Sequence, residues 1–284
     1  MQLLLPAAVF ILMVSVGMSL RWPELVANWR ALNKSAWVRL VLATFLVPAT
    51  VALILARVFP LTLHQTAGLF MVGATPGAPL LTRNLSRRGF NMQIAASYQV
   101  WGAVLTPIMI PVMVFLAAKL YDRHIWIPPR ILAWQIIEKE FLPLLVGMAL
   151  MHFAPEVSRK SQRAVNIVGN VVLSLVFVVL LWKMGPELKA VTPWIIAAAV
   201  LLLISSIAVM HLLVRADPVV VRTFAVSNAN RHVGLALLIS GRYMHNRDAL
   251  PVIACYALSV MALMIVAPKI FRPHELAKEA MAGS

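Results

Sequence analysis

A cluster of polar residues stands in the middle of an apolar stretch that runs from Val219 to Ser240. Its members are Ser227, Asn228, Asn230, Arg231 and His232. As a helix, a stretch of this length just covers a hydrocarbon core of ~30 Å. A guanidinium at that depth costs between ~3 and ~15 kcal/mol unless it meets a partner or a water-filled cavity. The cluster therefore predicts a binding site inside a membrane.

A second unusual stretch, TAGLFMVGATPGAPLLTRNLSRRG, carries helix-breaking residues followed by polar ones. Pro76, Gly77 and Pro79 should interrupt a helix, because proline removes a ladder hydrogen bond and clashes with the preceding turn. Broken backbone at membrane depth is tolerated where it is buried in protein or lines a cavity. We expect the break to belong to the binding site together with the polar residues that follow it, which are Thr82, Arg83 and Asn84. The alternative for Arg83 is a place at the cytoplasmic interface.

Other polar side chains in apolar stretches leave two interpretations open. His232 could bind and release a proton during a functional cycle, or stay neutral and hydrogen-bonded to a neighbouring helix. Glu138 and Glu140 flank Lys139 and could relay protons or form an ion pair near the membrane interface. Gln99 is expected either at the site or in an ordinary interhelical hydrogen bond. The same two interpretations apply to Tyr98, Asn166 and Asn170.

The composition is that of a polytopic membrane protein. Of 284 residues, 61% are hydrophobic and only 12% charged, with a mean hydropathy of +0.86, whereas soluble domains keep about a quarter of their residues charged. The net charge of +15 comes from basic residues in predicted loops, which favours contact with anionic membrane lipid over nucleic acid. No phosphate-binding loop, nucleophile elbow or metal-ligand spacing appears, so we expect no enzymatic activity, no metal and no cofactor.

Charged residues and Pro/Gly clusters divide the chain into nine predicted membrane helices, which gives an all-α fold. The predicted helices are Leu3 to Leu20, Trp37 to Val58, Thr66 to Thr82, Met92 to Leu120, Ile131 to Phe153, Val165 to Met184, Trp194 to Val214, Val219 to Ser240 and Leu250 to Phe271. We expect residues 1–130 to form one repeat, residues 131–271 a second, and residues 272–284 a cytoplasmic tail.

The two polar stretches occupy related places among these helices. Each is followed by one long helix, and the chain passes from one stretch to the other through an odd number of membrane crossings. The same pattern therefore crosses the membrane in opposite directions, as in inverted-topology repeats with discontinuous helices. Lys and Arg are in excess on the loops of the carboxyl-terminal side. This predicts a cytoplasmic carboxyl terminus and an outside amino terminus, in a bacterial inner membrane.

Five short motifs, in their order and spacing, resemble the bile acid:sodium symporter family of secondary transporters. They are MVSVGMSLRWPEL, FLVPAT, GATPGAPLL with the following SRRG, FLPLLVG and NRHVGLAL. The resemblance implies two inverted five-helix repeats, arranged as a panel and a core domain, with two unwound helices that cross beside the substrate site. The chain resembles members that lack the first helix, since its amino terminus begins where the family's second helix would.

The resemblance also implies sodium-coupled uptake of an organic anion, such as a bile acid or a small carboxylate. Two positions differ from the family's symporters. Where they carry a glutamate that serves both sodium sites, this chain has Ser227, and where they carry a glutamine ligand it has Arg231. Sodium gives up its hydration only to oxygen ligands, so we expect weak or absent sodium coupling. Proton coupling stays open.

Arg231 could supply in fixed form the charge that sodium brings and hold the anion bidentately, or it could be a purely structural cation. The function expected is transport of an organic anion by alternating access. The alternative is a non-transporting membrane sensor or ligand-binding scaffold with the same fold. The sequence leaves the substrate, the direction of transport and the oligomeric state open.

Overall fold

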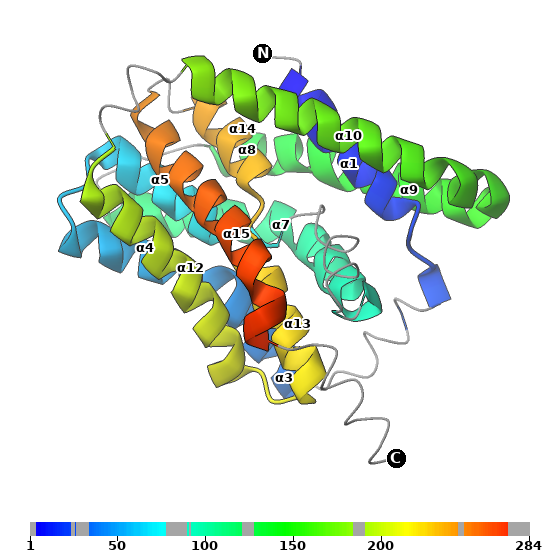
Figure 1. The fold of residues 1–284 in the computed structure, drawn as a ribbon, viewed down its shortest axis with the longest axis horizontal. Coiled ribbons are helices and arrows are strands. Elements are labelled where there is room, and N and C mark those ends of the chain that lie inside the picture. Colours follow the sequence, from blue (N-terminus) through cyan, green and yellow to red (C-terminus); the bar gives the residue numbers. More distant parts are fainter. Residues whose placement is uncertain are drawn as a thin grey trace.

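The computed structural model describes residues 4–23, 26, 34–77, 90, 92–120, 128–183, 191–243 and 247–271. Apart from an isolated backbone bridge between Gly77 and Arg231, these residues form helices joined by short connections (Figure 1). The prediction of an all-α fold is confirmed for this part of the chain.

Four helices among the described residues are long and apolar enough to cross a membrane. They are Lys34–Val58, Ser97–Lys119, Pro193–Leu213 and Leu250–Phe271. The apolar helix α1 (Leu4–Gly17) is shorter. These helices agree with an integral membrane protein, while the count of nine membrane helices, the inverted repeats and the orientation of the termini stay predictions.

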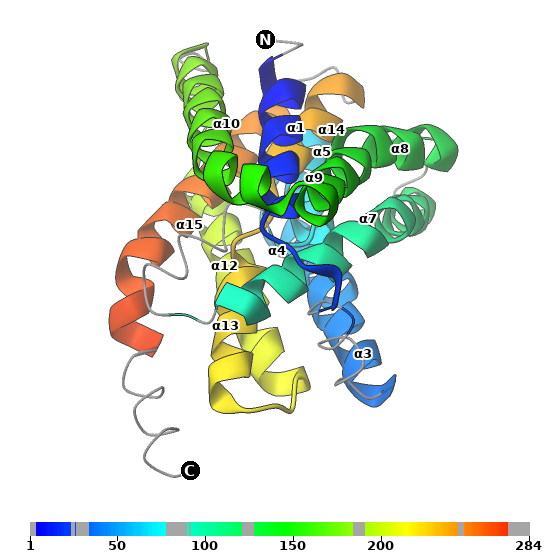
Figure 2. The same ribbon diagram turned by 90° about the vertical axis from the view of Figure 1, so that its right-hand side faces the viewer.

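Three helices pack against one another and form what we call the three-helix group (Figures 1 and 2). They are α1, α9 (Leu142–Phe153) and α10 (Pro155–Lys183). α1 and α9 touch at two glycines, because a Cβ on Gly147 would lie 2.8 Å from the Cα of Gly17. Close approach of this kind is typical of small residues between membrane helices.

The remaining helices form what we call the core group, built around the largest cluster of buried apolar side chains. It consists of α3 (Lys34–Val41), α4 (Val47–Val58), α5 (Leu63–Ala74), α7 (Met92–Leu120), α12 (Pro193–Leu213), α13 (Pro218–Ala229), α14 (Val233–Tyr243) and α15 (Leu250–Phe271). The helix α8 (Pro129–Ile136) packs on α7 and continues into α9, so it joins the two groups.

Two of the long helices contain a π turn followed by a proline. The turn Leu42–Leu46 lies between α3 and α4, ahead of Pro48, and the turn Ile137–Phe141 lies between α8 and α9, ahead of Pro143. Because proline has no N–H, Pro48 cannot bond the carbonyl one turn earlier, which belongs to Thr44. Turns of this type are frequent at functional sites.

The structure moves the start of two predicted helices and divides a third where a break was expected. α10 begins at Pro155, ten residues before the predicted start at Val165, because the charged residues in between lie on an exposed helical face rather than in a loop. The predicted stretch Val219 to Ser240 contains α13 and α14, which are separated at Asn230 to His232, inside the stretch that was expected to be discontinuous. α5 begins at Leu63, three residues before the predicted start at Thr66, and ends at Ala74 before Pro76, as the proline predicts.

Replacing Gly147 by leucine should weaken the three-helix group, because the new side chain would overlap the backbone of α1 at Gly17. Overpacking of this kind costs about 1–3 kcal/mol. We expect a lower melting temperature of the purified protein in detergent. Ala149→Leu, on the exposed side of the same helix, is the control. Equal melting of the two variants would show that the glycine contact is unimportant.

Candidate functional site

Two helices are interrupted deep inside the core group. α5 gives way at Thr75 to extended backbone, with φ −80° and ψ 142°. Pro76 accounts for this end, because it offers no N–H and disfavours helical backbone in the residue before it. α13 gives way at Asn230, with φ −86° and ψ 70°, and the helix resumes as α14 at Val233. No proline causes the second break, so contacts with other elements must hold it.

The two breaks cross and bond to each other. Gly77 and Arg231 form an antiparallel backbone bridge, and the N–H of His232 donates to the carbonyl of Pro76 at 2.8 Å. A Cβ on Gly77 would lie 2.6 Å from the carbonyl oxygen of Ser227, so only glycine allows this approach. The predicted breaks therefore lie side by side and form one crossing.

The guanidinium of Arg231 lies at this crossing and is fully buried. Its Nη1 donates to the carbonyl oxygens of Thr44 at 2.7 Å, Gly73 at 3.1 Å and Thr75 at 2.5 Å. Its Nη2 donates to Oδ1 of Asn228 at 3.0 Å. Four protein oxygens therefore surround the terminal nitrogens, and we call this set of oxygens the carbonyl cage.

The carbonyl cage needs a positive charge for two reasons. The carbonyls of Gly73 and Thr75 lie at the carboxyl end of α5, where the partial negative charge of the helix dipole is concentrated. The carbonyl of Thr44 lies in the π turn ahead of Pro48, and it too needs a donor. Of the two roles expected for Arg231, the structural cation is the one that corresponds to this geometry.

Asn228 and Ala229, at the end of α13, link the crossing to three other helices. The Nδ2 of Asn228 donates to the carbonyl of Ser206 at 2.7 Å, and its Oδ1 accepts from the hydroxyl of Tyr98 at 2.8 Å. The hydroxyl of Tyr256 donates to the last carbonyl of α13 at 2.6 Å. These bonds occupy backbone and side-chain groups that the second break would otherwise leave without a partner in an apolar interior. They explain how a helix without proline stays interrupted.

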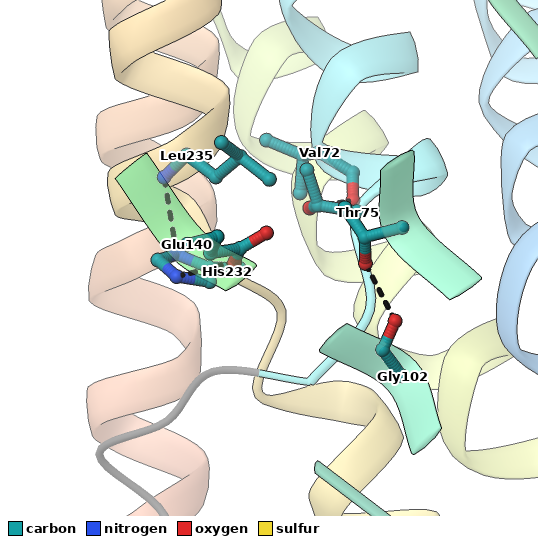
Figure 3. Close-up of polar contacts among 7 residues, drawn as sticks. Val72, Thr75, Gly102, Glu140, His232 and Leu235 are labelled. Atoms are coloured by element: carbon teal, nitrogen blue, oxygen red, sulfur yellow. Dashed lines mark hydrogen bonds and ion pairs between the residues drawn. The ribbon is translucent and has the colours of Figure 1, made fainter. Parts of the chain in front are cut away.

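His232 meets Glu140 of the π turn Ile137–Phe141, which leads into α9 of the three-helix group (Figure 3). Its Nε2 lies 2.9 Å from Oε1 of Glu140, at an angle outside that of a good hydrogen bond. Its Nδ1 accepts from the N–H of Leu235 at 3.0 Å. A ring nitrogen that accepts carries no proton, so the ring is neutral with its proton on Nε2. Both side chains are nearly fully buried.

A small cavity lies between the three-helix group and the crossing. Its volume is about 10 Å³, which holds a single water molecule at most. It is lined by Met13, Val16, Pro76, Gly77, Gln99, Ala103, Glu140, Leu144 and His232. The lining residues come from α1, the first break, α7, the α8–α9 helix and the second break. Both groups and both breaks therefore meet a shared space at this cavity.

A protein-family comparison identifies the chain. The model of the sodium bile acid symporter family matches residues 6–190. The chain belongs to this family. The matched stretch includes the first break and ends before the second, and a comparison with individual curated proteins gives no match. The proteins of this family are transporters, so the chain is an integral membrane protein of transporter type.

The structure places some of the predicted site residues of this symporter family member at the crossing. Those at or beside it are Pro76, Gly77, Gln99, Ser227, Asn228, Asn230, Arg231 and His232. The predicted residues Pro79, Thr82, Arg83 and Asn84 lie outside the described residues. Asn166 and Asn170 are not at the crossing, because Asn170 donates to Asn166 within α10 at 2.7 Å.

Glu140 is one of the residues for which two roles were expected, a proton relay or an ion pair near the membrane interface. The expected ion pair exists between Lys139 and Glu138, whereas Glu140 is 1% exposed and faces His232. Glu138, Lys139 and Glu140 all lie in the π turn Ile137–Phe141, which directs Glu140 to the interior. The sequence signal of this turn is Pro143 in FLPLLVG. The backbone oxygens of the carbonyl cage have no sequence signal of their own, apart from Pro48 in FLVPAT.

Removing the charge of Arg231 should destabilise the crossing. In Arg231→Met the carbonyl cage loses its donors, and a buried cluster that loses its charged partner costs about 3–5 kcal/mol. Thermal unfolding of the purified protein measures this cost. Arg222→Met is the matched control, because Arg222 donates to one carbonyl, that of Phe271, at 2.6 Å. A smaller loss for Arg231→Met than for Arg222→Met would contradict the role of the cage.

Proposed function

We propose that this family member is a secondary transporter that moves a small organic anion across the membrane by alternating access. The observation that carries the proposal is the crossing of two interrupted helices at the boundary between the three-helix group and the core group. Half-helix ends of this kind bind ions and substrates in transporters. The three-helix group corresponds to the panel that the family resemblance implies.

The amino end of α14 is the part of the crossing suited to an anion. The helix begins at Val233, directly after His232, and its first N–H groups carry the positive end of the helix dipole toward the cavity side. The volume of the cavity, about 10 Å³, is too small for any organic anion. Substrate entry therefore requires the three-helix group to move away from the core group.

Sodium is not the coupling ion at the crossing in this proposal. The oxygens of the carbonyl cage that could serve as ligands already accept hydrogen bonds from Arg231. Ser227, at the position of the family's glutamate, brings no negative charge, and a second cation beside a guanidinium would be repelled. The guanidinium of Arg231 occupies the carbonyl cage and, as a structural cation, stabilises the crossing throughout the cycle.

A measurement of anion flux distinguishes a transporter from a non-transporting sensor. Proteoliposomes loaded with unlabelled taurocholate, pyruvate or lactate are placed in the same labelled anion, with sodium replaced by choline. Countertransport of at least one of these probes is expected because the chain carries its own cation. Binding without flux would indicate the non-transporting sensor instead. Flux that stops when sodium is removed would contradict the sodium-independent mechanism but not transport itself.

Exchanging two residues should create a sodium site. In Ser227→Glu combined with Arg231→Gln, the carbonyl cage is released from the guanidinium and a carboxylate is added beside it. We expect sodium, and not choline, to raise the free energy of unfolding of the double variant by about 2.7 kcal/mol at a hundredfold excess over the dissociation constant. The melting temperature of the double variant should rise accordingly. Arg231→Gln alone is the control. Sodium stabilisation of the unchanged protein would contradict the exclusion of sodium.

A further inference from the structure

Glu140 is a buried acid whose surroundings do not compensate a permanent negative charge. Its side chain is 1% exposed, and Oε1 meets His232 at 2.9 Å. Its other oxygen, Oε2, has no hydrogen-bond partner among the described residues. An ionised carboxylate with a single contact to a neutral ring is costly in an apolar interior. The same carboxyl group in protonated form has no such cost.

The groups that face Glu140 from each neighbouring element are few. α1 contributes the apolar Met13 and Val16 and contains no ionisable side chain, and α7 contributes Gln99 and Ala103. The remaining ionisable groups of these elements point elsewhere. Glu138 and Lys139 pair with each other at the surface, Tyr98 bonds Asn228, and Arg231 bonds the carbonyl cage. In the described part of the chain, His232 alone faces Glu140 as an ionisable group.

His232 is not the group that takes up a proton in this arrangement. Its Nδ1 accepts the N–H of Leu235 in the first turn of α14. A proton on Nδ1 would break that bond and place a positive charge at the positive end of a helix dipole, which is unfavourable. An added proton therefore goes to the free oxygen of Glu140, where it forms an O–H bond.

The pair formed by Glu140 and His232 also crosses the boundary that must open. Glu140 lies on the helix that continues into the three-helix group, and His232 lies at the second break of the core group. Opening the cavity separates these two side chains. An ionised Glu140 would then face an arriving anion across a small space and repel it. A protonated Glu140 would not.

We propose that Glu140 is the proton-binding site that couples transport, so that one proton and one organic anion are bound and released together. The proton comes from the aqueous side to which the cavity opens, binds Oε2 as the pair separates, and leaves on the other side. This inference rests on the proposed transport function. In this inference the proton is the coupling ion in place of sodium, and Glu140 is the residue that binds it.

Proton binding is measured first without any substrate. Infrared difference spectra of the purified full-length protein in lipid nanodiscs, between acidic and alkaline buffer, report protonated carboxyl groups. We expect a carboxylic acid band that is present in the wild type and in Glu138→Gln and is missing in Glu140→Gln. Glu140→Asp should restore a shifted band. An unchanged band in Glu140→Gln, or no band in the wild type, would overturn the proposal.

Coupling is measured in proteoliposomes with labelled taurocholate, pyruvate and lactate as probes. For one proton per monovalent anion, an inside-alkaline pH difference should concentrate the transported probe about tenfold for each pH unit. Glu138→Gln, altered at an exposed acid, should behave like the wild type. In Glu140→Gln any remaining exchange should be independent of pH, while Glu140→Asp should regain gradient-driven accumulation.

The two proposals fail in different ways in this experiment. Wild-type exchange of a probe that ignores the pH difference would overturn proton coupling and leave the transport function standing. Absence of exchange for every probe would contradict the transport function, and the infrared band would still decide whether Glu140 binds the proton. Glu140→Gln could also lower the melting temperature of the protein. If Glu140→Asp melts like the wild type, transport by Glu140→Asp is the measurement to compare with the wild type.

Discussion

The crossing of the two broken helices depends on one buried charge. Interrupting α5 exposes carbonyls at the end of a helix dipole, and a membrane interior offers no water to bond them. Arg231 solves this problem with Nη1, which reaches three carbonyls from two separate helices, and with Nη2, which reaches Asn228. A planar guanidinium with several donors suits such a task better than a compact ammonium. The guanidinium thus holds both breaks in place.

The same charge divides the crossing into two faces with different chemistry. On one face, the carbonyl cage, Asn228 and Tyr98 form a closed hydrogen-bonded network inside the core group. On the other face, His232 and Glu140 border the small cavity against the three-helix group. The network on the first face should stay intact, because separating any of its members would leave a buried polar group without a hydrogen bond. On the second face, Oε2 of Glu140 has no hydrogen-bond partner among the described residues, and this face lies where the two groups must part.

Much of this arrangement could be predicted from the sequence, and the reasons are specific. The break at Pro76 follows from proline chemistry, and a functional role for Arg231 follows from the cost of a charge in a membrane. The three carbonyl partners of Arg231 could not be predicted, because they are backbone oxygens of segments far away in the chain. The depth of Glu140 could not be predicted either, since a π turn changes which face of its helix the carboxylate occupies. The early start of α10 has a similar explanation, because charged residues mark a loop in a simple hydropathy reading and an exposed helical face in the structure.

The most direct test of the central claim is an experimental high-resolution structure determined in a sodium-containing buffer. We predict density for the Arg231 guanidinium among the carbonyls of Thr44, Gly73 and Thr75, with no ion between them. A bound ion at that place, with Arg231 turned into the cavity, would contradict the account.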